Sequence, residues 1–169
     1  MSKPASNLVL GTSGALKLKL INPKVQHEMV KTWAEIQVKE LQAISNRQRN
    51  MFNTACIVVD EKNNKVYFGR NGGIDKDNAF HNEILFGPKG TIGKGLIPAK
   101  SLNQYPTPYN CAESHAINKA LNNGANISDL HIYVISTSQY DFGKPKPCCK
   151  NCTVAYKGKI KKNNSGWSE

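Results

Sequence analysis

Two short stretches of the chain place cysteines where a metal ion could be bound. The first, NCAESH, contains Cys111, and the second, KPKPCCKNC, contains Cys148, Cys149 and Cys152. A zinc ion that takes part in a reaction is held by three protein ligands and keeps a fourth position for water. Cys111, Cys149 and Cys152 would supply three thiolates, since the Cys-x-x-Cys spacing lets two of them reach one ion. The sequence therefore predicts a zinc site with an open position.

Glu113 stands two residues after Cys111, at the start of a predicted helix. Residues two apart on a helix do not share a face, so Glu113 is poorly placed to be a second ligand from this helix. Its long side chain could instead reach a water activated by the metal, take a proton and deliver it to a ring nitrogen. A helix N-terminus also favours the thiolate form of Cys111. The pattern indicates general acid/base chemistry beside a metal.

The cysteines also fit two other kinds of site. A Cys-x-x-Cys pair can form a thioredoxin-like redox centre, which would leave Cys111 and Glu113 without a role. A structural zinc site would be closed by all four cysteines, at 111, 148, 149 and 152, and would not need Glu113. His115 could approach the metal, but a helix histidine is more often a packing residue. Cys56 is expected to be a small buried residue.

Local signals mark the elements that carry the two stretches. Asn110 is a plausible N-cap and Gly124 a stop for the helix between them. Residues 129–137, DLHIYVIST, predict a strand in the middle of a sheet. A short helix is expected over residues 149–156, followed by a basic tail, KGKIKKNN.

The N-terminal half supplies a helix and a hairpin. Apolar residues recur at helical spacing over residues 25–49, and the stretch ACIVVDEKNNKVYFGR, residues 55–70, has the pattern of two antiparallel strands. Residues 1–23 are interpreted as an extension or linker, in which LKLKL, residues 16–20, could be an edge strand. Residues 71–109 show no sustained period and predict a substrate-facing insertion.

Composition and charge limit the class of protein. A chain of 169 residues that is 39% hydrophobic predicts one α/β layered domain, here over residues 24–169. The formal charge of +11 favours polyanionic partners, with nucleic acid the first candidate, although a solubilising surface would also explain it. No apolar run approaches the roughly eighteen residues that a membrane span needs. The crowded cysteines indicate metal or redox chemistry in a reducing compartment.

The stretch CAESHAINKALNNGANISDLHIYVIS, with KPKPCCKNC after it, resembles the zinc-dependent nucleobase deaminase superfamily. Within that superfamily it is most similar to the YwqJ-type deaminases, which occur as C-terminal toxin domains of bacterial secreted proteins. The resemblance implies a three-layer α/β/α deaminase-like fold whose mixed sheet has an N-terminal antiparallel hairpin. It also implies Zn²⁺ as cofactor, Cys111, Cys149 and Cys152 as its ligands, and Glu113 as the proton shuttle.

Three substrate-binding residues are expected beside this centre. In the superfamily an asparagine after the second strand often contacts the substrate, and Asn71 in GRNGG occupies that place. Tyr109 and Asn110 directly precede the first ligand, and an aromatic ring there could stack on a base. In the superfamily's motif the proline directly precedes the cysteine pair, whereas here Cys148 intervenes. We favour Cys149 as ligand because CKNC resembles the family's own ending.

The resemblance implies hydrolytic deamination of a base in nucleic acid, with cytosine as the expected base. It further implies a toxin that is secreted or delivered into a target cell, acts in its cytoplasm and is bound by a cognate immunity protein. A housekeeping deaminase of nucleosides or transfer RNA, and a basic zinc module that only binds nucleic acid, are the alternatives. The sequence leaves open the exact base, DNA or RNA, the strand state, the sequence context and the oligomeric state.

Overall fold

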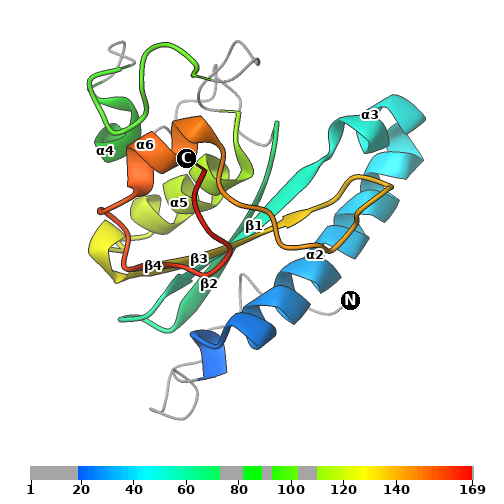
Figure 1. The fold of residues 1–169 in the computed structure, drawn as a ribbon, viewed down its shortest axis with the longest axis horizontal. Coiled ribbons are helices and arrows are strands. Elements are labelled where there is room, and N and C mark those ends of the chain that lie inside the picture. The colour runs from blue at the N-terminus through cyan, green and yellow to red at the C-terminus, as the bar shows by residue number, and fades with distance from the viewer. Residues whose placement is uncertain (1–18, 73–81, 89–92, 103–109, 169) are drawn as a thin grey trace.

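A four-stranded mixed sheet lies between two layers of helices (Figure 1). The structure is a computed structural model that describes residues 19–72, 82–88, 93–102 and 110–168. The strands are ordered β2-β1-β3-β4, and their bounds are β1 (Thr54–Asp60), β2 (Lys65–Arg70), β3 (Leu130–Ser136) and β4 (Lys162–Asn163). Strand β1 pairs antiparallel with β2 and β3, and β4 pairs parallel with β3. The predicted three-layer fold and its N-terminal hairpin are confirmed.

Each central strand is buried on both faces. All residues of β1 and β3 are buried, and alternate side chains enter two separate cores, as the pleat of a strand requires. Cys56 and Val58 face one core, whereas Ala55 and Ile57 face the other. This two-sided burial explains why residues 129–137 read as a continuous apolar run rather than an alternating one.

Helices α5 and α6 cover one face and helix α2 the other (Figure 1). The first layer contains α4 (Glu83–Phe86), α5 (Ala112–Asn122) and α6 (Lys150–Tyr156), and a short 3-10 turn, Ile127–Asp129, leads into β3. The second layer contains α2 (Pro23–Ile44), and α3 (Asn46–Met51) follows it. Among the described residues, no helix combines the length and apolar character that a membrane span requires.

The single helix expected over residues 25–49 is wrong, because two helices occupy this region. Ser45 lies between them in an extended conformation, with φ −171° and ψ 156°. Its hydroxyl accepts a hydrogen bond from the N–H of Gln48 and so caps α3, while its own N–H closes α2 on the carbonyl of Leu41. A serine that serves as cap on both sides leaves the hydrophobic period almost unchanged, so periodicity alone does not reveal the break.

Helix α5 begins one residue later than expected. Its N-cap is Cys111 rather than Asn110, and no side chain caps it. The helix ends just before Gly124, as predicted, and this glycine has φ +89°. The N–H of Gly124 donates to the carbonyl of Leu121, and the N–H of Ala125 donates to the carbonyl of Ala120. This pair of bonds is the Schellman motif, in which glycine supplies the left-handed residue.

The stretches expected to be peripheral contribute to the cores. Lys19 and Leu20 lie in a helical turn rather than a strand, and Leu20 is buried; residues 16–18 of the expected edge strand lie outside the described residues. The expected basic tail is not a tail, because Ile160 is buried and Lys162 and Asn163 form β4. The division into an extension and a domain at residue 24 stays a prediction.

Candidate metal centre

Three cysteine thiols meet where the first turns of two helices approach each other. The ligand atoms of Cys111, Cys149 and Cys152 lie within 4.8 Å of one another, and the sulfurs of Cys111 and Cys149 are 3.2 Å apart. Sulfur atoms that share a zinc ion lie about 2.3 Å from it, so this spacing fits a single ion. The donor set is three soft thiolates, which zinc prefers. The cluster therefore fits Zn²⁺ with a fourth position left for water.

The cluster is assembled by helix starts. Cys111 is the N-cap residue of α5, and Cys149 is the N-cap residue of α6, with Cys152 in the first turn of α6. Neither N-cap side chain makes a capping hydrogen bond to the first turn of its own helix. Both thiols are therefore left to point into the space between the helices, at the positive ends of two helix dipoles, where thiolates are stabilised.

Gly69 in β2 brings helix α5 close to the sheet. A Cβ atom at this position would lie 2.3 Å from the carbonyl oxygen of Ala112 and 2.5 Å from the backbone nitrogen of Ala116. Both atoms belong to the backbone of α5, so they could not move aside without moving the helix. The absence of a side chain at residue 69 thus sets the position of the helix that begins at Cys111.

Glu113 lies directly beside the thiols and is only 2% exposed. Burial raises the pKa of its carboxyl group, and the neighbouring Cys149 raises it further, while hydrogen bonds from the thiols of Cys148 and Cys152 act in the opposite direction. A bound divalent cation would also favour the charged carboxylate. Glu113 still lines the cavity in front of the cysteines, so its buried carboxylate remains accessible to a molecule held there.

The thiols of the cluster are difficult to ionise without a cation. The hydrogen bond with Cys149 and burial raise the pKa of Cys111, and burial raises that of Cys152. A metal ion must be bound by thiolates, so its arrival would release protons and reverse these shifts. Metal affinity at this centre is therefore expected to depend on pH.

Cys148 does not join the cluster, although it precedes Cys149 directly. Its side chain is fully buried, and its sulfur accepts a hydrogen bond of 3.3 Å from the amide of Asn163. Its backbone N–H donates to the carbonyl of Gly166 and its carbonyl accepts from Ser168. These contacts fix the loop that presents Cys149 and Cys152. A zinc site closed by four cysteines is not assembled among the described residues.

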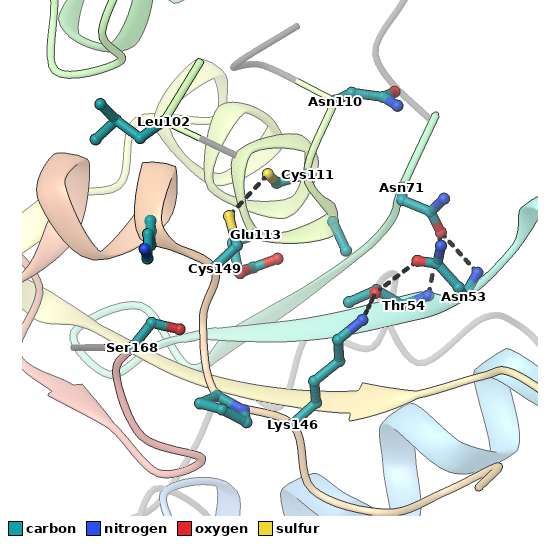
Figure 2. A pocket seen from close by; sticks show the side chains of 13 residues that line it. Asn53, Thr54, Asn71, Leu102, Asn110, Cys111, Glu113, Lys146, Cys149 and Ser168 are labelled. Atoms are coloured by element: carbon teal, nitrogen blue, oxygen red, sulfur yellow. Dashed lines mark hydrogen bonds between the residues drawn. The ribbon is translucent and has the colours of Figure 1, made fainter. Parts of the chain in front are cut away.

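A cavity of about 540 Å³ opens in front of the cluster. Figure 2 shows Cys111, Cys149 and Glu113 on one side of it and Thr54, Asn53 and Asn71 on the other. Its volume lies within the range of roughly 300–1,000 Å³ that small-molecule sites occupy. The cavity can therefore hold a molecule the size of a nucleotide base with one face against the thiols.

Two of the three predicted substrate-binding residues line the cavity. Asn71 lines the cavity, but its amide oxygen accepts the N–H groups of Asn53 and Thr54, and its amide nitrogen donates to the carbonyl of Met51. Asn110 also lines the cavity and is exposed. Tyr109 lies outside the described residues. Contact of these residues with a substrate stays a prediction, and for Asn71 the structure adds a role in holding the start of β1.

His115 and Cys56 have packing roles. The Nδ1 atom of His115 accepts a hydrogen bond of 3.2 Å from the backbone of Arg70, and His115 is not part of the cysteine cluster. Burial, with the charges of Lys119 and Arg70, lowers the pKa of His115 to about 3, so its ring is neutral. Cys56 is fully buried in the core that lies behind the centre.

Lys146 and Thr54 line the cavity and were not predicted as site residues. Lys146 lies within KPKPCC, three residues before Cys149, so its nearness to the ligands is visible in the sequence. No motif distinguishes it from the many other basic residues of the chain. Nothing in the sequence places Thr54 near it, because the two residues meet only through the pairing of β1 with β3.

Comparison with known families agrees with this geometry. The family model described as the cytidine and deoxycytidylate deaminase zinc-binding region matches residues 29–163. Searches of curated proteins and of solved structures each found no match. The matched region contains all three clustered cysteines and Glu113, and it spans most of the sequence. The chain belongs to the family of the cytidine and deoxycytidylate deaminase zinc-binding region.

Proposed function

We propose that this chain is a zinc-dependent hydrolytic deaminase that converts cytosine to uracil in nucleic acid. Cys111, Cys149 and Cys152 would hold the metal, and Glu113 would carry the proton. The observation that supports this most strongly is a buried carboxylate that touches the cysteine cluster and also lines the cavity. A closed structural zinc site has no use for such a group.

Bound zinc supplies a water molecule that loses a proton near neutral pH. Glu113 would accept this proton and deliver it to N3 of a base held in the cavity, as the oxygen of the water adds to C4. The same carboxylate would then move the proton of the new C4 hydroxyl to the amino group, so that the C4–N bond breaks, ammonia leaves and C4 becomes a carbonyl. One water is consumed and uracil remains, so the single residue Glu113 serves as base and then as acid.

Nucleic acid is favoured over a free nucleoside by the charge of the chain. A net charge of +11 attracts a polyanion, whereas an uncharged nucleoside gains nothing from it. A base inside a duplex would have to leave the stack to reach the cavity, so single strands are the simplest substrate. A nucleoside or transfer-RNA deaminase is the competing proposal, and the choice of substrates below separates the two.

We further propose, from the resemblance to YwqJ-type domains alone, that the chain is a toxin delivered into a target cell. It would act in the cytoplasm and be neutralised by a cognate immunity protein. Expression inside bacteria should then stop growth, and this arrest should require Glu113. Unimpaired growth of cells that contain active enzyme would contradict the toxin role without affecting the proposed chemistry.

The test of the reaction is Glu113→Ala together with the isosteric Glu113→Gln. Both variants should bind zinc and fold like the wild type, since Glu113 is a proton carrier rather than a ligand. Uracil formation should fall at least about a hundredfold, the low end of what a positioned acid/base group contributes. The substrates are deoxycytidine and cytosine-containing oligonucleotides of single-stranded DNA, double-stranded DNA and RNA.

Glu83→Gln is the matched control, because it removes the same charge from an exposed position on α4. It should deaminate like the wild type. Activity of Glu113→Gln at the wild-type rate would refute the mechanism, and loss of zinc from that variant would make Glu113 a structural residue. A wild-type protein that acts on deoxycytidine but on none of the oligonucleotides would favour the nucleoside deaminase.

A further inference from the structure

We propose that Lys146 is a specificity-determining residue, which binds a phosphate group next to the target base. The site would then distinguish a nucleotide within a strand from a free nucleoside. This inference rests on the proposed function, because it assumes that the cavity holds the base. It concerns a different wall of the cavity from the one that carries the cysteines.

Lys146 lies along the wall of the cavity and points away from the cysteine cluster. Its backbone N–H donates to the carbonyl of Val134, and its ammonium group donates a hydrogen bond of 2.7 Å to the hydroxyl of Thr54. Figure 2 shows the side chain rising to Thr54 on the side opposite Cys111 and Cys149. The positive charge is therefore held at the edge of the space that a bound base would occupy.

Thr54 is itself fixed in place. Its hydroxyl donates a hydrogen bond of 2.8 Å to the side-chain oxygen of Asn53, and its N–H donates to Asn71. A hydroxyl that donates to Asn53 keeps its lone pairs directed at Lys146. The lysine thus loses little further freedom when it binds an anion, which increases the affinity gained from the contact.

The ammonium group of Lys146 has no carboxylate partner among the described residues. Asp141 is near enough for Lys146 to lower its pKa, but this carboxylate is mainly stabilised by hydrogen bonds from Ser136 and Ser138. Thr54 takes only one of the three ammonium protons. A half-buried cation with free donors and no counter-ion is suited to an anionic ligand.

A phosphate matches this group better than a base edge does. The side-chain oxygens of Asn53, Thr54 and Asn71 on the same wall already accept hydrogen bonds from neighbouring residues, so this wall offers a base edge few acceptors. A lysine ammonium is a compact, strongly hydrated point charge and a common ligand of phosphate. In a polynucleotide every base is flanked by two phosphodiesters, so one of them can lie at this wall while the base faces Glu113.

A double-mutant cycle on binding tests the contact. The protein is the zinc-loaded Glu113→Ala variant, which should bind without turnover, and the ligand is single-stranded DNA with one cytosine. Each phosphate flanking that cytosine is replaced in turn by an uncharged methylphosphonate. Lys146→Met should weaken binding of the unmodified strand about tenfold, the factor that one charge-assisted hydrogen bond supplies. One of the two methylphosphonate substitutions should weaken binding to the protein that retains Lys146 by a similar factor. The same substitution should leave binding to the Lys146→Met protein unchanged.

Lys144→Met is the control, because Lys144 is an exposed lysine on the same loop that does not line the cavity. It removes the same charge, yet each methylphosphonate substitution should reduce strand binding to this variant by the same factor as to the parent. Thr54→Val keeps the lysine and removes the acceptor that orients it, so part of the coupling to the same phosphate should be lost. This variant reports on the contact even if Lys146→Met fails to fold.

The inference is overturned if each methylphosphonate substitution weakens strand binding to the parent and to Lys146→Met by equal factors. Lys146 would then contact the base or contribute only to the general positive charge. The inference is also overturned if the parent binds the strand no better than deoxycytidine. These results differ from failure of the proposed function, in which the wild type forms no uracil from any cytosine substrate. Coupling between Lys146 and one phosphate can be observed even in that case.

Discussion

Cys148 and Cys149 are adjacent in the chain, yet their thiols have different surroundings. Cys149 faces the cavity and approaches Cys111, whereas Cys148 points into the core and accepts a hydrogen bond from Asn163. Because successive side chains in an extended segment point in opposite directions, only one of two neighbouring cysteines can face the metal. The choice between them is therefore a property of the loop rather than of the thiols.

This difference predicts the zinc content of single variants. The wild type should carry about one zinc per chain, and Cys149→Ala or Cys152→Ala should lose it, because two thiolates do not complete the site. Cys148→Ala should keep its zinc, with a moderate loss of stability from the small cavity that it leaves. Elemental analysis of the purified variants, together with their urea midpoints, provides the measurement.

Cys56→Ala serves as the control, since Cys56 is as buried as Cys148 but lies on strand β1. It too should keep the metal. Zinc retention by Cys149→Ala combined with loss from Cys148→Ala would show that the loop rearranges when the metal binds and that the ligand is Cys148.

Single residues are where the sequence was most informative. Thiols and a carboxylate at fixed spacings are rare enough to identify the centre, and the structure brings the three predicted cysteines together. Lys146 and Thr54 could not be predicted to meet, because residues 92 apart in sequence are brought together only by the fold. The hydrogen bonds that occupy Asn71 also depend on tertiary contacts and leave no trace in the local sequence.

At the scale of elements, the contact of β2 with α5 decides where the centre forms. Gly69 should not tolerate a side chain, because its Cβ would meet two backbone atoms of α5. Gly69→Ala is expected to destabilise the protein by about 2 kcal/mol, as overpacking does, and to weaken zinc binding because Cys111 moves with the helix. Urea unfolding and chelator competition measure the two effects.

Gly124→Ala distinguishes this steric effect from a general effect of losing glycine. Residue 124 has φ +89° and open space around it, so alanine there should cost about 1 kcal/mol of backbone strain. It lies at the far end of α5 and should leave zinc affinity unchanged. Equal zinc affinities for Gly69→Ala and the wild type would show that the approach of β2 does not position Cys111.

The element types could be predicted where local chemistry determines them. The hairpin of residues 55–70, the central strand and the glycine-terminated helix all follow from patterns within a few residues. The break at Ser45 was missed because a cap between two helices preserves the hydrophobic period. Residues 157–164 read as a basic tail because Ile160 is one apolar residue among lysines, and only pairing with β3 orders them.

At the scale of the whole molecule, basic residues lie at both ends of the sheet. Lys146 and Lys150 line the cavity near the start of β1, whereas Lys161 is paired with Glu61 just beyond its end. The seven residues of β1 separate these two regions by about 20 Å, at the usual rise per residue in a strand. A strand whose base occupies the cavity is therefore expected to contact mainly the first region.

Salt dependence tests this division. Binding of a single-stranded oligonucleotide should weaken steeply with salt, because each lysine contact displaces a counter-ion. Lys150→Met should reduce the slope of log K against log salt by about 0.7, the value for one phosphate of a single strand. The double variant Lys161→Met/Lys162→Met, which removes twice the charge, should leave the slope unchanged.

The opposite ranking, with a shallower slope only for the double variant, would place the nucleic acid along β4. A flat response in the wild type would argue against a polyanionic substrate altogether. Each variant is compared at equal zinc content, so that a disturbed metal centre is not mistaken for a lost phosphate contact.

The segment after β4 has a consequence for when the enzyme becomes competent during synthesis. Gly166 and Ser168 hold the backbone of Cys148, and Ser168 also forms part of the cavity wall. A chain is made from its N-terminus onward, so all three clustered cysteines leave the ribosome before the residues that secure their loop. A nascent chain that has reached Cys152 but not Ser168 would thus hold the thiols without a fixed arrangement. Chains that end between Cys152 and Ser168 should remain inactive, and activity should appear only once the loop is fastened from the C-terminal side.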